Sequence, residues 1–345
     1  MHYAMNKTVL LIGPNFHDFN RYVSSALEKL GRKVVVEAYD TPITPYTKWN
    51  KVAYKVSADK EGMRDISRMR FSEQAVDTFD KVHPQIVFLL NGEMLTPQAV
   101  QHFQKSAKVI VWFYDSITRV PHCWNIVPFC HKVFCYEQED IRLIRDCLGI
   151  VAEFLPQAVD PSAYFNIPDV KKEWDIVFAA DMWKSPKRMR LIQSVVDAFP
   201  EKKIRVWGIY KPWYKGFWRS VTRERRDIYT NRNTSSSQLN LDYNKARVVL
   251  NIHNEQQVVG ANPKLYEISA TGSYQVCDTN PYIQSLFQNS EVGLYKDEEE
   301  LIEQIAWALD PNNDMEREQR AQQARTLILS AHTYECRVRN VLENI

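Results

Sequence analysis

Residues 260–272, GANPKLYEISATG, have the residue types and spacing of a turn and helix that could bind a nucleotide. They lie between two apolar runs, residues 247–253 and 273–277. The order of strand, turn, short helix and strand predicts a βαβ unit, whose helix points its N-terminus at the crevice where ligands bind. Free backbone N–H groups there favour phosphate, and Glu267, about two turns in, is placed to accept a hydrogen bond from a ribose hydroxyl. The segment therefore predicts a nucleotide site, and we expect the nucleotide to be a sugar donor.

Other residues of the same segment support this interpretation. Glu267 alone could equally be a helix acid favoured by the helix dipole. The presence of Gly260, Lys264 and Gly272 around it favours a binding role.

A basic pair, Lys187 and Arg188, lies at another predicted helix start. The helix dipole disfavours cations there, so the pair indicates a nearby anion such as the donor diphosphate; the alternative is a solvated basic turn. Gly208 follows Trp207 at the end of a predicted strand. It would either let the nucleotide base approach or serve as a plain turn glycine.

Three candidates for an acceptor-activating base occur in the N-terminal half. Asp115 ends the apolar run 109–113, where a parallel sheet places its ligand crevice; the alternative is a turn aspartate. His17 lies in the loop after the first apolar run, and a lone loop histidine is more often incidental. Glu93 also follows a strand-like run and is the third candidate.

No metal or other cofactor is expected. One stretch holds several zinc-type ligands but lacks a Cys-x2-Cys pair, so core thiols are the better interpretation: His122, Cys123, Cys130, His131 and Cys135. No Asp-x-Asp follows a strand-like run, so we expect no metal-held diphosphate.

Residues 211–226, KPWYKGFWRSVTRERR, interleave basic and aromatic side chains. Such a segment could touch an anionic membrane surface or a lipid-diphosphate acceptor. The alternative is a loop that packs its aromatic rings on its own domain. A nucleic-acid partner is not expected, because nothing else in the chain supports one.

The composition fits a globular chain of two domains. The 345 residues are 45% hydrophobic and 25% charged, with a net charge of +2 that implies no polyanionic partner. Six cysteines without paired spacing suggest reduced thiols. The N-terminus has no signal core and no apolar run approaches about 20 residues, so we expect a cytoplasmic protein, with peripheral contact on the inner face of the membrane as a possibility.

Apolar runs and helical stretches alternate along the chain and predict doubly wound α/β domains. Residues 41–70 are expected to be irregular, with a helix from 71 to 82. The expected organisation is a Rossmann-like N-terminal domain over residues 1–165, a second over residues 166–330, and a C-terminal helix over residues 331–345. Two such domains facing a central cleft form the GT-B architecture.

The chain also resembles the CgeB-like, spore-maturation type glycosyltransferases from about residue 85 to the end. The short motifs that carry the resemblance are residues 111–115, 132–136, 154–160, 174–178, 187–188, 242–246, 249–253, 262–267, Gly272, 331–334 and Arg337. The resemblance implies sugar transfer from a nucleotide donor held mainly by the C-terminal domain, with Asn262 in the donor site. Two positions depart from the pattern: Lys264 stands where the family usually has Arg, so a bidentate fork is lost. Val259 stands where many retaining enzymes have a first glutamate, which leaves the stereochemistry open.

These observations predict a metal-independent transferase that moves a sugar from a nucleotide sugar to a glycan or lipid-linked acceptor in surface polysaccharide biosynthesis. Two alternatives remain open at this point. One is a nucleotide-sugar epimerase of the same fold, and the other is a nucleotide- or glycan-binding module without catalysis.

Overall fold

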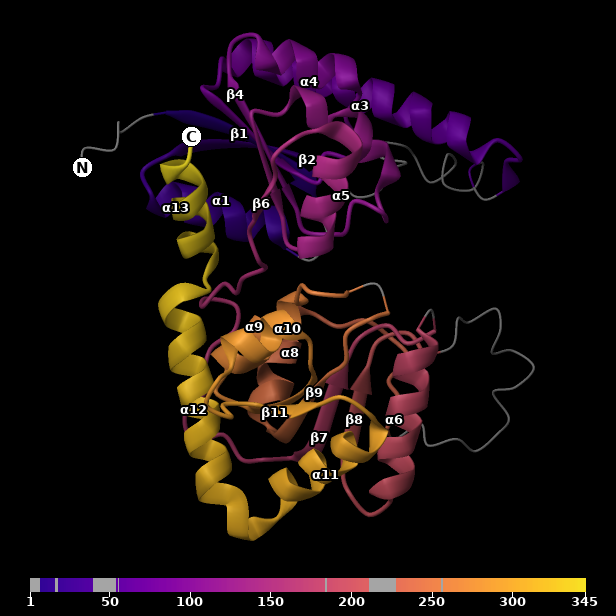
Figure 1. Ribbon diagram of the computed structural model, residues 1–345, viewed down its shortest axis with the longest axis vertical. Coiled ribbons are helices and arrows are strands. Elements are labelled where there is room, and N and C mark those ends of the chain that lie inside the picture. The colour runs from indigo at the N-terminus through magenta and orange to yellow at the C-terminus, as the bar shows by residue number, and fades with distance from the viewer. Residues whose placement is uncertain are drawn as a thin grey trace. The chain divides into compact units, whose positions relative to one another are not determined.

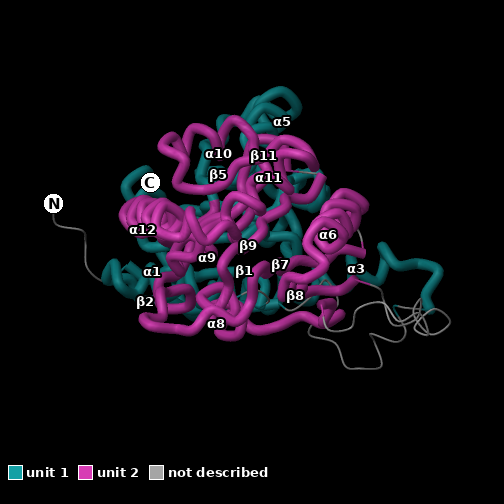
Figure 2. Tube along the Cα trace, turned by 90° about the horizontal axis from the view of Figure 1, so that it is seen from below, with its two compact units in different colours: residues 1–156, 334–345 teal, residues 157–333 magenta. Residues whose placement is uncertain are grey.

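The structure is a computed structural model that describes residues 7–15, 18–39, 54, 56–183, 185–210, 228–255 and 257–345. The chain divides into two compact units (Figure 2). Unit 1 comprises residues 1–156 and 334–345, and unit 2 comprises residues 157–333. The change from unit 1 to unit 2 thus falls at Pro156, whereas the domain boundary predicted from the sequence lies at residue 165.

Unit 1 is built on a six-stranded, all-parallel sheet with the order β2-β1-β3-β4-β5-β6. The strands are β1 Thr8–Pro14, β2 Lys33–Tyr39, β3 Ile86–Leu90, β4 Lys108–Phe113, β5 Lys132–Cys135 and β6 Glu153–Phe154. Five of the strands match apolar runs in the sequence, because a parallel sheet covered on both faces buries every side chain of its central strands. All five residues of β3 are buried.

Helices cover both faces of this sheet (Figure 1). They are α1 Phe19–Lys29, α3 Lys60–Val82, α4 Pro97–Gln104, α5 Gln138–Leu148 and α13 Tyr334–Glu343, with the 3-10 turns η1 Pro121–Asn125 and η2 Val127–Phe129. One face of the sheet packs on side chains of α3 and α4, including Phe71 and Phe103. On the other face, the ring of Tyr334 from α13 lies 6.1 Å from that of Trp112 and 5.2 Å from that of Tyr22.

The expectation that residues 41–70 are irregular is wrong for residues 60–70, which form the first half of α3. The side chain of Asp59 caps the helix by accepting a hydrogen bond from the N–H of Gly62 at 2.8 Å. Ion pairs one turn apart, such as Arg68 with Asp65, support this charged half of the helix. Its apolar residues Ile66 and Met69 are exposed, so no buried apolar stripe marked it in the sequence.

Unit 2 contains a five-stranded, all-parallel sheet with the order β11-β10-β9-β7-β8. The strands are β7 Trp174–Ala179, β8 Ile204–Trp207, β9 Ala246–Asn251, β10 Tyr274–Asp278 and β11 Gly293–Tyr295. The helices are α6 Pro186–Ala198, α8 Ser236–Asn244, α9 Pro263–Ala270, α10 Pro281–Leu286, α11 Glu298–Leu309 and α12 Asp314–Ala331, with the turn η3 Pro311–Asn313. Side chains of α6 and α11 pack on one face of the sheet, and those of α8, α9 and α12 on the other.

The two sheets share one strand order. Numbered within its own unit, each runs 2-1-3-4-5, with a sixth short strand at the edge in unit 1. In this doubly wound order the connections reverse direction between the first and third strands, and ligands bind at the carboxyl ends of the strands at that switch point. The switch points lie between β1 and β3 in unit 1 and between β7 and β9 in unit 2.

None of the helices that the structure describes is both long enough and apolar enough to cross a membrane. The segment 211–226, for which membrane contact is predicted, lies outside the described residues, so that prediction stays open.

Candidate functional site

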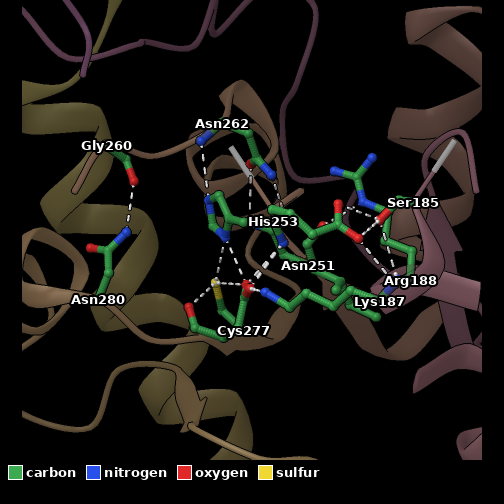
Figure 3. Close-up of polar contacts among 12 residues, drawn as sticks. Ser185, Lys187, Arg188, Asn251, His253, Gly260, Asn262, Cys277 and Asn280 are labelled. Carbon is green, nitrogen blue, oxygen red and sulfur yellow. Dashed lines mark hydrogen bonds and ion pairs between the residues drawn. The ribbon is translucent and has the colours of Figure 1, made fainter. Parts of the chain in front are cut away.

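The turns after β7, β9 and β10 bring a group of polar side chains together at the switch point of unit 2 (Figure 3). We call these residues the switch-point cluster: Ser185, Lys187, Arg188, His253, Glu255, Asn262, Cys277 and Asp278. The cluster includes three of the residues predicted for the nucleotide site and five that the sequence did not assign to it.

Helix α9 begins at this cluster with a complete N-terminal cap. Asn262 is the N-cap, and its side-chain oxygen accepts a hydrogen bond from the N–H of Leu265 at 3.1 Å. The amide of Asn262 also exchanges two hydrogen bonds with that of Asn251, at 2.8 and 3.2 Å. The carbonyl of Gly260 accepts a hydrogen bond from the amide of Asn280 at 2.8 Å (Figure 3). The turn that the sequence predicts for phosphate is therefore held in place from two neighbouring strands.

His253 links this turn to the end of β10. The N–H of Asn262 donates to Nε2 of His253 at 3.1 Å, so that nitrogen carries a lone pair. Nδ1 of the same ring lies 2.7 Å from a carboxylate oxygen of Asp278 and must hold the proton of a neutral ring. The carboxylate of Asp278 also accepts bonds of 3.0 and 3.1 Å from the backbone N–H of His253.

The ammonium group of Lys187 completes the network, at 2.6 Å from the other oxygen of Asp278. Burial opposes ionisation of Asp278, but His253 and Lys187 outweigh it and hold the pKa of the carboxyl well below its usual range. Asp278 is therefore an ionised, largely buried anchor for one basic side chain of the cluster, and it offsets the charge of Lys187.

Among the described residues, one group has the composition of a metal site: His253, Cys277 and Asp278, with candidate ligand atoms within 4.8 Å of one another. The bonds just described occupy both ring nitrogens of His253. Burial raises the pKa of the Cys277 thiol well above its usual value, whereas a metal requires the thiolate. A hydrogen-bonded support for the α9 turn accounts for these three residues better than a metal centre does.

The N-terminus of α6 holds an acidic side chain of the protein itself. Ser185 is the N-cap, and its hydroxyl accepts a hydrogen bond from the N–H of Arg188 at 3.3 Å. The Glu255 carboxylate accepts from the N–H of Lys187 at 3.0 Å and from the Ser185 hydroxyl at 3.0 and 3.1 Å. Partial burial opposes ionisation of Glu255, but these donors and the nearby Arg188 hold its pKa below the usual value. A carboxylate therefore sits where a helix N-terminus favours an anion.

Arg188 points back onto the loop backbone. Its Nε donates to the carbonyl of Ile252 at 2.8 Å, and its Nη1 donates to the carbonyl of Asp181 at 3.2 Å. The sequence places Lys187 and Arg188 at a helix start, and α6 confirms this position by beginning at Pro186. Their predicted contact with a diphosphate stays a prediction.

Glu267 lies farther along α9, with its side chain 14% exposed and 4.0 Å from the ammonium of Lys264. Burial raises the pKa of Glu267, while Lys264 and a hydrogen bond with Tyr164 act against the shift. Glu267 is thus a largely buried hydrogen-bond acceptor beside a cation. Its predicted hydrogen bond with a ribose hydroxyl stays a prediction.

The two remaining glycines have structural reasons of their own. Gly208 follows β8 with φ +112, and a Cβ there would lie 2.2 Å from the carbonyl oxygen of Ala180. Gly272 ends the segment after α9 with φ +74, a conformation that glycine adopts without cost. Both positions therefore require glycine for the backbone alone.

In unit 1, Glu93 and Asp115 follow β3 and β4 at the carboxyl edge of the sheet. Asp115 forms an ion pair of 2.6 Å with Arg119. Burial and the neighbouring Asp115 raise the pKa of Glu93 to about 7, against the opposing charges of Arg68 and Arg119. His17 lies outside the described residues.

A groove of about 670 Å³ lies in unit 1 between α3 and α4, lined in part by Arg68, Ser72, Thr96, His102 and His122. Arg68 connects it to the turn after β3, because its Nε donates to the carbonyl of Glu93 at 3.3 Å.

The cluster residues that the sequence did not assign are Ser185, His253, Glu255, Cys277 and Asp278. Asp278 is the last residue of β10 and Asp115 follows the end of β4, so the rule that pointed to Asp115 could also have found Asp278. Nothing in the sequence shows that His253 and Asp278 face each other, because β9 and β10 come together only through sheet pairing.

A family model described as "Glycosyl transferase-like" matches residues 187–343. Among curated proteins, no sequence match was found.

Three solved structures illustrate what the whole chain is similar to. Sucrose-phosphate synthase from Thermosynechococcus elongatus has a TM-score of 0.69 and 11% identity, and 98% of each chain is covered. The HepE protein of Anabaena in complex with UDP-glucose has a TM-score of 0.68 and 11% identity, covering 98% of this chain and 100% of that one. A glycosyltransferase from Rickettsia africae has a TM-score of 0.65 and 12% identity, covering 99% and 98%. The family model matches less than half of the chain, over most of unit 2. The similar structures cover the whole chain and show that its two Rossmann-like units have the GT-B fold.

Proposed function

We propose that this protein is a nucleotide-sugar-dependent glycosyltransferase of the CgeB-like group, with its donor site at the switch point of unit 2. The observation that carries the proposal is that the α6 and α9 N-termini and two basic side chains gather at the carboxyl ends of β7, β9 and β10. A parallel sheet with this strand order binds its ligand there, and the glycosyl transferase-like match, which begins at residue 187 in α6, covers β9, α9 and β10 but not β7.

The donor diphosphate would lie against the N-termini of α6 and α9. The two helix N-termini have dipoles that favour an anion, and the N–H of Lys187 would become a donor to the diphosphate once the Glu255 carboxylate moves away. Lys187, Arg188 and Lys264 would offset the charge that develops on the leaving group. Glu267 would accept a hydrogen bond from the ribose. Similar structures were solved with UDP or UDP-glucose, which favours a uridine nucleotide as the first donor to test.

The acceptor would be a glycan or a lipid-linked glycan activated by a side chain of unit 1. Glu93 and Asp115 support this part of the proposal, because both lie at the carboxyl edge of that sheet and burial raises the pKa of each. Transfer would need no metal, since cationic side chains can stabilise the diphosphate. Residues 211–226 would bring the protein to the membrane surface where a lipid carrier resides.

Calorimetry with UDP, GDP and ADP on the wild-type protein and on Glu267→Ala tests the donor site. Losing a largely buried hydrogen bond to a charged acceptor should weaken the binding nucleotide by roughly ten- to a hundredfold, because such bonds contribute about 1.5–3 kcal/mol. Glu299→Ala is the matched control, since Glu299 is exposed on α11 in the same unit.

Equal affinities for the wild type and Glu267→Ala would refute the role of Glu267, and failure of every nucleotide to bind would refute the donor site. Release of the nucleoside diphosphate together with a glycosylated acceptor would then separate a transferase from an epimerase or a binding module.

A further inference from the structure

The position of the switch point in unit 1 distinguishes between Glu93 and Asp115, two of the residues that the sequence predicts as candidate bases. The switch point lies between β1 and β3, so the turn after β3, which carries Glu93, borders it directly. Asp115 follows β4, one strand farther from the switch point. Ligands of doubly wound sheets bind at the switch point, and this position favours Glu93 over Asp115.

The turn that carries Glu93 is fixed in an uncommon backbone conformation. Asn91 has φ 59 and Gly92 has φ 76, and the N–H of Gly92 donates to the carbonyl of Leu90 at 2.8 Å. The side-chain oxygen of Asn91 accepts from the N–H groups of Tyr114 and Asp115, at 3.1 and 3.5 Å. Glycine adopts this conformation without cost and asparagine visits it more readily than most residues, so these two residue types suit a tight turn here. The turn after β3 is thus fastened to the end of β4.

Two more elements hold the same turn. From α3, Arg68 donates through Nε to the carbonyl of Glu93 at 3.3 Å, and from β2 the hydroxyl of Tyr39 donates to the carbonyl of Leu90 at 3.2 Å. The carboxylate of Glu93 is partly buried, and among the described residues we find no hydrogen bond to it. A rigid backbone therefore presents a carboxylate that the surrounding described residues leave available.

The charges around Glu93 differ from those around Asp115. Glu93 faces Asp115 and Arg119 after β4, Arg68 on α3, Tyr39 on β2, and Tyr114 and Cys123. Burial and Asp115 favour its protonated form, and the two arginines act against this. Asp115 is instead committed to Arg119 at 2.6 Å, and that cation opposes the effect of burial on the pKa of Asp115. A base works best when its pKa lies near the working pH, and Glu93 meets this condition.

We propose that Glu93 takes the proton of the acceptor hydroxyl, and that Asp115, held by Arg119, is a positioning residue that acts through Glu93. The proposal rests on the proposed transferase function. In the transfer step, the acceptor oxygen bonds to the anomeric carbon of the donor sugar, and the bond from that carbon to the diphosphate oxygen breaks. The diphosphate leaves with the electron pair, and the acceptor proton passes to the carboxylate of Glu93.

The test is the pH–rate profile of nucleoside diphosphate release from a panel of UDP-, GDP- and dTDP-sugars, with water as the acceptor. We compare the wild type, Glu93→Gln and Asp115→Asn, with Glu28→Gln as the control because Glu28 is exposed on α1 of the same unit. Glu93→Gln should lower turnover at pH 8 by about 10²–10⁴-fold, the usual contribution of a placed base, and should leave UDP affinity unchanged.

Asp115→Asn provides the readout for a positioning role. Removing the like charge should lower the pKa of Glu93, so the acid limb of the profile should move from near pH 7 to lower pH while turnover stays within about tenfold of wild type. The reverse pattern, in which Asp115→Asn abolishes turnover and Glu93→Gln spares it, would overturn the proposal.

Melting temperatures at pH 5 guard against a purely structural effect. Glu93 is mostly protonated at pH 5, so Gln is a close neutral replacement for it. The wild type and Glu93→Gln should therefore have the same melting temperature at this pH. A lower melting temperature for Glu93→Gln overturns the proposal. If the wild type turns over a donor and Glu93→Gln keeps that rate, this proposal alone fails. If the wild type neither binds nor cleaves any donor, the transferase function fails and the proposal fails with it.

Discussion

Replacing Glu255 by Gln should tighten nucleoside diphosphate binding, although the change removes a charged residue from the candidate site. The Glu255 carboxylate accepts hydrogen bonds from the N–H of Lys187 and the hydroxyl of Ser185 at the N-terminus of α6. A diphosphate bound at that N-terminus would need the same donors, so the carboxylate must first move away. A neutral amide holds this position less firmly and does not repel phosphate.

The size of the effect follows from the exposure of Glu255. The residue is exposed, and after allowance for solvent screening an interaction of this type with a helix N-terminus contributes about 0.5–1 kcal/mol. Releasing it corresponds to a two- to fivefold gain in affinity, at about 1.4 kcal/mol for each factor of ten. The free energy that the variant gains in nucleotide binding equals the free energy of unfolding that it loses when Glu255 no longer stabilises α6. Without nucleotide, Glu255→Gln should therefore melt at a slightly lower temperature than the wild type.

Calorimetry with UDP on the wild type, Glu255→Gln and Glu298→Gln measures this difference. Glu298 is the matched control because it contacts α6 through Ser194, away from the N-terminus, with an oxygen-to-oxygen distance of 2.7 Å. We expect tighter binding for Glu255→Gln alone. Weaker binding would show that Glu255 contacts the ligand, and equal affinities would show that the diphosphate lies elsewhere; either result refutes the reasoning.

Three further predictions concern the support of the site and its surroundings. Asp278→Asn should lower the free energy of unfolding at pH 7 by up to about 3 kcal/mol, because the ammonium of Lys187 loses its buried partner. The pKa of Asp278 is lowered in the folded protein, so its contribution to stability is lost as the pH falls. Denaturant titrations should therefore show a smaller difference in stability between wild type and variant in acid, and a difference that stays constant with pH would contradict this prediction. EDTA should leave sugar transfer intact, and a rate abolished by EDTA and restored by magnesium or manganese would disprove metal independence. Changing Trp213, Phe217 and Trp218 to Ser should reduce sedimentation with anionic liposomes, as should high salt, whereas a triple mutant that binds as before would favour a packing loop.

Local patterns in the sequence determined most of the elements of this protein. The apolar runs at residues 8–13 and 108–113 became β1 and β4, because strands buried on both faces have no polar side to alternate with. Helix α6 begins beside the predicted basic pair, and α9 begins at Pro263 after an Asn cap. Caps and apolar runs act over a few residues, so the sequence displays them directly.

The first half of α3 shows where local patterns were insufficient. Its charged residues pair along the helix surface and its apolar residues are exposed, so periodicity carried no signal. The return of α13 to unit 1 was equally hidden, because the ring contacts of Tyr334 join residues far apart in the chain.

The sequence by itself predicted that Lys187 and Arg188 lie at a helix start and that Glu267 lies within a short helix. Only the tertiary structure decided what surrounds them, since the order of the strands places the ends of β7, β9 and β10 side by side. That order pairs His253 with Asp278 and seats the Glu255 carboxylate on α6. Such contacts depend on strand pairing between distant segments, and the free energy of pairing is set by the whole sheet rather than by any local run of residues.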